Sequence, residues 1–132
     1  MDKGRLTFKK TERLSSRKEM GRLFSEGESM LVYPIRVVWA ETGCDLSRPA
    51  QAAFSVSKKS FRKAVDRNLL KRRMKEAYRL SKNLFYDGLG EKKVTIMFMY
   101  ISREMLSYTV IDRSVKNILR KMLKQIRQKQ SS

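Results

Sequence analysis

The apolar positions near the start of the chain predict a short helix over 17–26. They recur at spacings of three and four residues, the period of a helix with one buried face: Met20, Leu23 and Phe24. Ser16 and Glu19 form an S-x-x-E pattern, which is typical of the capping box that begins a helix. Gly27 is then expected to follow the last turn as the C′ residue.

Three further segments have the pattern of β-strands. The segment 31–41 is expected to be a strand in which Ile35, Val37 and Trp39 alternate with Arg36 and Val38, and Pro34 suits the start of a strand or the edge of a sheet. A turn-rich loop is expected over 42–49, before a second short strand over 52–57. The third segment, 94–101, is an almost continuous apolar run. Such a run predicts a strand that is buried on both faces.

Two longer helices are expected, one after the second strand and one after the third. The first spans about 61–84, and its apolar positions share one face: Leu70, Met74, Ala77 and Tyr78. Its other face is polar and basic: Asn68, Lys71, Arg72, Lys75, Arg79 and Lys82. The Asp-Gly-Leu-Gly sequence at 87–90 is expected to break the chain. The second helix should begin near Ser107, with an apolar stripe over 111–126.

The predicted order of elements is α-β-β-α-β-α, which indicates an α/β chain of the α+β type, with a sheet and its helices in two layers. Residues 1–132 are expected to form a single domain. We interpret 1–14 as an extended basic arm and 129–132 as a frayed end. The helix between the second and third strands is a crossover, so those strands could be parallel. A general rule of topology predicts a right-handed crossover in roughly 98% of such units.

The chain is strongly basic, with 31 Lys and Arg against 13 Asp and Glu, a formal net charge of +18. Because such a charge repels itself unless a polyanion neutralises it, nucleic acid is the expected partner. A membrane surface is the alternative, but the basic residues do not lie on a Trp- and Phe-rich amphipathic anchor. The chain has no apolar run of membrane-spanning length, no signal-like start and a single cysteine, Cys44. These features favour the cytoplasm.

The residue types that are missing restrict the possible chemistry. The sequence has no histidine and one cysteine, which excludes Ser-His-Asp and Cys-His sites and disfavours a zinc site. Nothing in the sequence marks a pair of carboxylates for acid–base work. If the chain serves an enzyme, we therefore expect another component to carry the chemistry, and we expect no cofactor to bind this chain directly.

The densest basic segment is 58–82, which contains eleven basic residues and two acids. One face of its predicted helix would lie in the core and the other on phosphates, where Lys and Arg release counterions. Arginine can also bind a phosphate through two parallel hydrogen bonds, and Asn68 adds an uncharged donor and acceptor. The alternative is a basic face that is merely solvated, and the same alternative applies to the seven basic residues over 113–129.

Three short motifs stand in and next to this segment: Ser-Val-Ser-Lys-Lys at 55–59, Ala-Val at 64–65 and Arg-Asn-x-x-Lys-Arg at 67–72. Together they closely resemble the signature of the bacterial ribonuclease P protein family, and the flanking elements follow the family's order over nearly the whole chain. Two positions depart from that signature. Leu69 stands where the family usually has a third arginine, and 60–63 lack the usual glycine and are one residue longer.

The resemblance implies a fold like the second domain of ribosomal protein S5, with a left-handed β-α-β crossover. It also implies that an RNA subunit holds the catalytic metal ions, and that the ribonucleoprotein requires magnesium. The protein would bind this RNA, as a monomer in a 1:1 complex, through the central motif: Lys58, Lys59, Arg62, Arg67, Asn68, Lys71, Arg72, Lys75 and Arg79. Arg73 or Arg62 is a candidate to replace the missing third arginine.

The resemblance further implies that the protein holds the single-stranded 5′ leader of precursor tRNA and so assists the 5′ maturation of tRNA. The leader would lie in a cleft between the first helix and the sheet, lined by Phe24 and by Phe8, Met20 and Trp39. Aromatic side chains stack on unpaired bases with little sequence preference. The alternative is that Phe24, Met20 and Trp39 belong to the core, as residues at this spacing usually do.

Two other classes of function remain open from the residues alone. A structural ribosomal protein would have a similar composition and a related fold. A helical DNA-binding module is less consistent with the sequence, because the strand over 94–101 indicates an α/β domain and not a bare helix-turn-helix. The central motif favours the RNA-binding subunit of a ribonucleoprotein enzyme.

Overall fold

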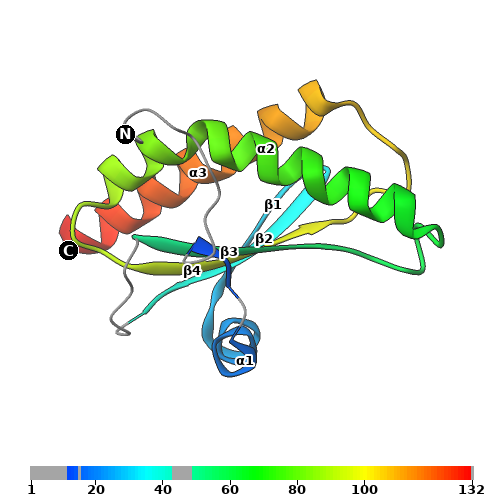
Figure 1. Cartoon of the computed structure of the whole chain (residues 1–132). Helices are drawn as coiled ribbons and strands as arrows, with labels where there is room; N and C mark the ends of the chain where they lie inside the picture. The colour runs from blue at the N-terminus through cyan, green and yellow to red at the C-terminus, as the bar shows by residue number, and fades with distance from the viewer. Residues whose placement is uncertain (1–11, 15, 43–48, 132) are drawn as a thin grey trace, which may run out of the picture.

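A four-stranded sheet carries two long helices on one face and one short helix on the other (Figure 1). The computed structural model describes residues 12–14, 16–42 and 49–131, with side chains up to residue 128. The elements are, in order, α1 (Arg17–Glu26), β1 (Glu28–Val32), β2 (Ile35–Glu41), β3 (Ala50–Val56), α2 (Ala64–Leu89), β4 (Val94–Tyr100) and α3 (Tyr108–Ser131). The predicted α/β class is confirmed. Because α1 lies on the face opposite α2 and α3, the sheet has helices on both sides and not on one.

The single strand predicted over 31–41 is wrong, since this region contains two strands and a hairpin. β1 and β2 pair in antiparallel fashion, with Val32 opposite Ile35, so the chain reverses at Tyr33 and Pro34. Proline has no N–H for the ladder, and here it marks the turn between two strands. The order of strands in the sheet is β1-β2-β4-β3, which leaves β1 and β3 at the edges.

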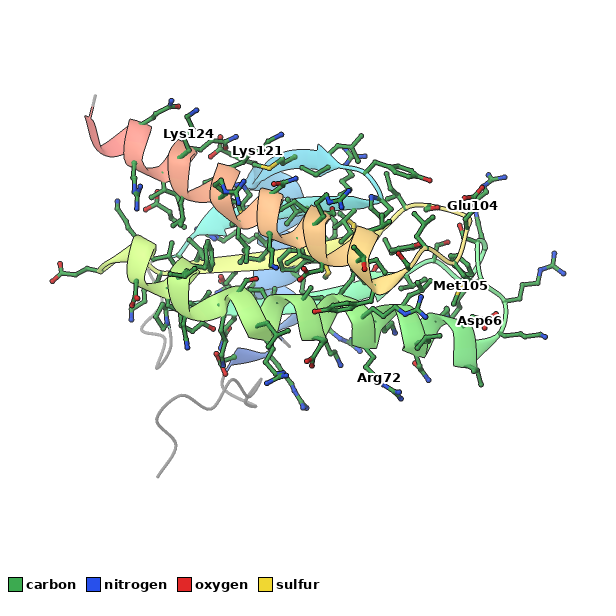
Figure 2. The ribbon with its side chains drawn as sticks, turned by 90° about the horizontal axis from the view of Figure 1, so that it is seen from above. Asp66, Arg72, Glu104, Met105, Lys121 and Lys124 are labelled. Atoms are coloured by element: carbon green, nitrogen blue, oxygen red, sulfur yellow. The ribbon has the colours of Figure 1, made fainter. Side chains whose placement is uncertain are left out.

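The connection from β3 through α2 to β4 joins two parallel strands. In Figure 2, which views the sheet from the side of α2 and α3, both strands run from left to right, and β4 lies above β3. With α2 passing back in front of them, the crossover is left-handed. The hand therefore agrees with the family resemblance and departs from the general rule, which roughly 2% of such units break.

The main core fills the space between the sheet and the helices α2 and α3. The four apolar positions predicted for α2 are all 0% exposed: Leu70, Met74, Ala77 and Tyr78. At its centre the Phe54 and Phe98 rings stack at 5.1 Å, and the Tyr78 ring meets them edge-on at 5.9 and 5.6 Å. A smaller core under α1 consists of Leu14, Leu23, Val38 and Met97. Every strand residue of these cores is thus fixed to one face of the sheet.

Helix α1 has the predicted bounds, and the hydroxyl of Ser16 accepts a hydrogen bond from the N–H of Glu19 at 3.2 Å. Gly27 follows the helix in an extended conformation, with φ −75°. A side chain there would collide with the carbonyl oxygen of Leu23 and would lie 2.9 Å from Val38 Cγ1. Gly27 is therefore needed for the close approach of α1 to the sheet, and not for a left-handed turn.

Helix α2 begins later and ends later than predicted. Phe61 is 6% exposed and packs its ring against Tyr100 at 5.9 Å, so the segment before Ala64 forms turns and not helix. The helix also continues through Gly88, although 87–90 was expected to break the chain. A Cβ atom at Gly88 would lie 2.6 Å from Leu123 Cδ1. This glycine lets α3 pack closely against α2, and the helix stops at Gly90, whose φ is +62°.

Candidate nucleic-acid interface

The outer face of α2 carries a row of polar and basic side chains opposite its buried face. Asn68, Arg72 and Lys75 are exposed, while Lys71 and Arg79 are half-buried. Their spacing of three and four residues places them on one side of the helix. Figure 2 shows Arg72 pointing away from the body of the molecule. These five residues, four of them basic, are here called the α2 stripe.

Within the α2 stripe, Arg79 already has a partner in the protein. Its Nε donates to Glu76 Oε1 at 3.0 Å, and this hydrogen bond lowers the pKa of the Glu76 carboxyl and raises the pKa of the arginine. Arg79 therefore offers less uncompensated charge to a polyanion than Arg72 or Lys75. Among the described residues, the positive charge of the stripe that no ion pair offsets thus lies on Lys71, Arg72 and Lys75.

The segment before α2 carries three exposed cations, Lys58, Lys59 and Arg62. Arg67 holds this segment in place, because its Nη1 donates to the carbonyl oxygens of Phe61 and Arg62, both at 2.8 Å. The sequence grouped Arg67 with the RNA-binding cations. In the structure, these hydrogen bonds fix the backbone that carries Arg62, and the role of Arg67 in RNA binding stays a prediction.

Arg73 does not replace the third arginine of the family signature. It is half-buried, and its Nη1 donates to the carbonyl oxygen of Leu106 at 2.7 Å, which ties the segment after β4 to α2. Leu69, at the position of the missing arginine, is itself half-buried. Arg62 is exposed and lies two residues before the first residue of α2, so it remains the candidate to supply this charge.

Lys82 does not belong to the basic face, contrary to the prediction. It is 6% exposed, and its Nζ lies 2.8 Å from both carboxylate oxygens of Glu12, which is 0% exposed. The hydroxyl of Tyr86 also donates to Glu12, and that of Tyr78 donates to Tyr86 at 3.4 Å. Burial raises the pKa of both tyrosines, so they remain hydrogen-bond donors. This network fastens the N-terminal segment to α2.

A second candidate surface lies beside α1, on the opposite face of the sheet. The register of the strands places four residues in one row: Leu31, Arg36, Met99 and Ser55. Leu31 is 60% exposed, Arg36 is exposed, and Met99 and Ser55 are half-buried. α1 covers the next row, which contains Val38 and Met97. The row of Leu31, Arg36, Met99 and Ser55 is not covered by α1 and is here called the open row. It is an accessible strip that crosses the sheet beside α1.

Phe24 is two residues, or about 200°, from Arg22 around α1, so it lies on the opposite flank, which faces the open row. The other flank is occupied, because Arg22 Nη2 donates to the carbonyl oxygen of Glu41 at 2.7 Å and Thr42 bonds to Glu19 at 3.4 Å, at the far end of β2. Figure 1 shows α1 end-on, so it lies across the strands and its flanks face their two ends. Phe24 is 59% exposed, which contradicts the alternative that it belongs to the core.

The other three residues predicted to line a cleft have different positions. Met20 is half-buried and packs on the small core under α1, one turn from Phe24. Trp39 is 0% exposed in the main core, on the opposite face of the sheet, so its assignment to the cleft is wrong. The alternation of β2 points Trp39 toward α2 and α3, together with Ile35 and Val37. Phe8 lies outside the described residues.

Sequence reasoning missed Leu31, Arg36 and Met99, because only the strand register brings them together. It also missed Glu12, an acid in a basic segment that looks solvated until its partner is known. No group of three or more Cys, Asp or Glu in 12–14, 16–42 and 49–131 could hold a metal ion. In the same residues, no helix is both long enough and apolar enough to cross a membrane.

Comparison with known proteins gives a consistent result. The model of the family described as Ribonuclease P matches residues 8–128. The ribonuclease P protein component of Porphyromonas gingivalis is 40% identical over 112 residues, which are 83% of this chain and 82% of the relative. That of Petrotoga mobilis is 30% identical over 91% of this chain and 95% of the relative.

Solved structures agree in fold. The ribonuclease P protein of Thermotoga maritima superposes with a TM-score of 0.66 at 24% identity, over 83% of this chain and 96% of that one. That of Staphylococcus aureus gives a TM-score of 0.66 at 20% identity, over 84% and 94%. The sequence matches establish the relationship and the structures establish the shared fold, so the chain belongs to the ribonuclease P protein family.

Proposed function

We propose that this chain is the protein subunit of a ribonucleoprotein ribonuclease P, which binds the catalytic RNA subunit and precursor tRNA and assists endonucleolytic cleavage at the 5′ end of the tRNA. The observation that carries the proposal is the family match over residues 8–128, on a chain that has a basic stripe on α2 and an open row beside α1. The two surfaces lie on opposite faces of the sheet and suit two different RNA segments.

The RNA subunit binds the α2 stripe and the segment before it. Arg72, Lys75 and Arg62 are exposed on rigid or anchored backbone. When they contact phosphates, only their own side chains lose conformational freedom, because the backbone is already ordered. Each phosphate that they neutralise releases counterions, and binding is therefore steeply salt-dependent. Asn68 adds an uncharged hydrogen-bonding group for a sugar or a base edge.

The 5′ leader of precursor tRNA binds along the open row. Four strands at about 4.8 Å spacing give this strip a length of roughly 14 Å. Phe24 offers a ring on which an unpaired base can stack, Leu31 and Met99 offer apolar contact, and Arg36 offers a charge for the backbone. None of these groups reads a base edge in a fixed geometry, so we expect the leader to be bound with little sequence preference.

The chemistry of cleavage belongs to the RNA subunit and its magnesium ions. Two-metal hydrolysis needs several carboxylates around the metal ions, and the described residues contain no such cluster. The whole sequence lacks histidine, the commonest general base. The protein instead brings two negatively charged RNAs together, as one monomer for each RNA subunit, and it acts in the cytoplasm where they meet.

Purification of the tagged chain from its source cells, followed by sequencing of the bound RNA, tests the proposal. One RNA that cleaves precursor tRNA when magnesium is added should be enriched, and it should be lost from an Arg72→Ala, Lys75→Ala variant. Enrichment of ribosomal RNA in its place would support the structural ribosomal alternative and contradict the proposal.

A further inference from the structure

The N-terminal segment joins the edge of the sheet beside β3. Arg13 forms a parallel bridge with Ala52, and the N–H of Leu14 donates to the carbonyl oxygen of Ala52 at 2.9 Å. The side chain of Leu14 is buried in the small core under α1. Arg13 and Leu14 are neighbours in the paired part of this segment and point to opposite faces, so Arg13 points toward α2, the side on which Glu12 also lies.

Arg13 there meets the inner edge of the α2 stripe. The Lys75 ammonium is partly desolvated by burial and feels the charges of Arg13 and Lys71, and these effects lower its pKa, with desolvation the largest. Lys71 and Lys75 are one turn apart on α2, and Arg13 approaches them from the sheet. Three cations from two parts of the chain that are about sixty positions apart therefore converge on one place.

This convergence is held in place and is not a chance approach of mobile side chains. The residue before Arg13 is Glu12, whose carboxylate is locked to Lys82 and Tyr86 in the buried network. The residue after it is the buried Leu14. Arg13 is thus exposed between two anchored neighbours, and its backbone cannot move away from Lys71 and Lys75. Like charges held together destabilise the free protein, and an anion between them removes that cost.

We propose that Arg13, Lys71 and Lys75 form a phosphate-binding site at the β3 edge, which holds one backbone phosphodiester of the RNA subunit. The proposal rests on the proposed function and deepens it: the RNA surface is not confined to one helix but extends across to the sheet. The guanidinium group of Arg13 approaches the phosphate from the sheet, and the ammonium groups of Lys71 and Lys75 approach it from α2. A single helix face cannot surround a phosphate from two sides in this way.

The test compares Arg13→Ala with Lys121→Ala, since each removes one positive charge from the same +18 chain. Figure 2 shows Lys121 on α3, away from Arg72 and the stripe. Affinity for the RNA subunit is measured by filter binding over a series of salt concentrations. Arg13→Ala should weaken binding about tenfold, as expected for a lost charge-assisted contact, and should reduce the salt slope by about 0.7–0.9. Lys121→Ala should change the affinity by less than about twofold.

Arg13→Ala combined with Lys75→Ala supplies a second criterion. If both side chains hold the same phosphate, the double variant should lose less affinity than the product of the two single losses. The phosphate site would be overturned if the affinity losses of the two substitutions were independent, or if Arg13→Ala changed the affinity no more than Lys121→Ala. Neither outcome would affect the wild-type affinity, so the proposed function would stand.

Separate binding measurements with the RNA subunit and with precursor tRNA show which of the two RNAs supplies the phosphate. A loss confined to the binding of precursor tRNA by the assembled ribonucleoprotein would overturn the assignment to the RNA subunit. Failure of the wild-type protein to bind the RNA subunit would instead contradict the proposed function itself. Circular dichroism of Arg13→Ala confirms that this exposed substitution leaves the fold unchanged.

Discussion

Glu12 and Lys82, 70 positions apart in the sequence, form a buried ion pair in which both carboxylate oxygens lie 2.8 Å from the ammonium nitrogen. The pair joins the N-terminal segment to the middle of the longest helix. Because Arg13 directly follows Glu12, the ion pair also fixes the position of Arg13 beside the basic surface of α2. A contact inside the molecule therefore shapes a surface that we assign to RNA.

Glu12→Gln should lower the free energy of unfolding by about 3–5 kcal/mol, because it leaves the Lys82 charge buried without its partner. Glu76→Gln, which breaks the partly exposed pair with Arg79, should cost less than about 1 kcal/mol and serves as the control. Urea unfolding followed by circular dichroism gives both values. Equal losses for the two variants would show that the buried pair does not anchor the N-terminal segment.

Arg13→Ala should raise the pKa of Lys75 in the free protein. Burial, Arg13 and Lys71 lower this pKa, so removal of one neighbouring charge relieves part of the effect, and desolvation and Lys71 keep the rest. In wild type, Lys75 thus loses its proton at a lower pH than an ordinary lysine does. An NMR titration of the Lys75 side chain measures the shift, and an identical titration curve in both proteins would place Arg13 too far away to share a phosphate.

Phe24→Ala should weaken the binding of precursor tRNA that carries a leader, and should leave stability within about 1 kcal/mol of wild type, since the ring is 59% exposed. Leu23→Ala, at the neighbouring but fully buried position, should cost about 2–5 kcal/mol of stability. Mature tRNA without a leader is the binding control. An equal loss with and without the leader would remove Phe24 from the leader site.

Arg72→Ala should weaken binding to the RNA subunit by about 1–3 kcal/mol without loss of stability, because Arg72 is exposed on the α2 stripe. Arg67→Ala should reduce stability as well, because its two hydrogen bonds hold the segment before α2. Affinity and unfolding midpoint are measured on both variants. If Arg72 and Lys71 can be replaced together at near-physiological salt with no change in affinity, the α2 stripe is not the docking surface.

The local patterns of the sequence were sufficient where one helix face meets one core. Leu70, Met74, Ala77 and Tyr78 are buried as predicted, and Ser16 begins α1 as predicted. The hand of the β3–α2–β4 crossover could not be predicted in this way, because no periodicity along the chain encodes it. It came only from the resemblance of 55–72 to a known family.

Residues that depend on partners distant in sequence could not be placed from the pattern. Lys82 has the spacing of the α2 stripe, and only the contact with Glu12 shows that it is buried. Trp39 follows Val38 in a strand that is covered on both faces, so alternation did not show which of them faces α1. Arg36 and Met99 became candidates only when the register placed them next to each other.

Cleavage of precursor tRNA across a magnesium series, by the RNA subunit alone, the protein alone and the two together, tests the central claim most directly. The protein alone should not cleave, and the mixture should cleave at magnesium concentrations where the RNA alone is inactive, because a +18 protein screens the repulsion between the two RNAs. The rates should converge at saturating magnesium. Cleavage by the purified protein alone that a single substitution abolishes, or a magnesium requirement that the protein leaves unchanged, would contradict the proposed role.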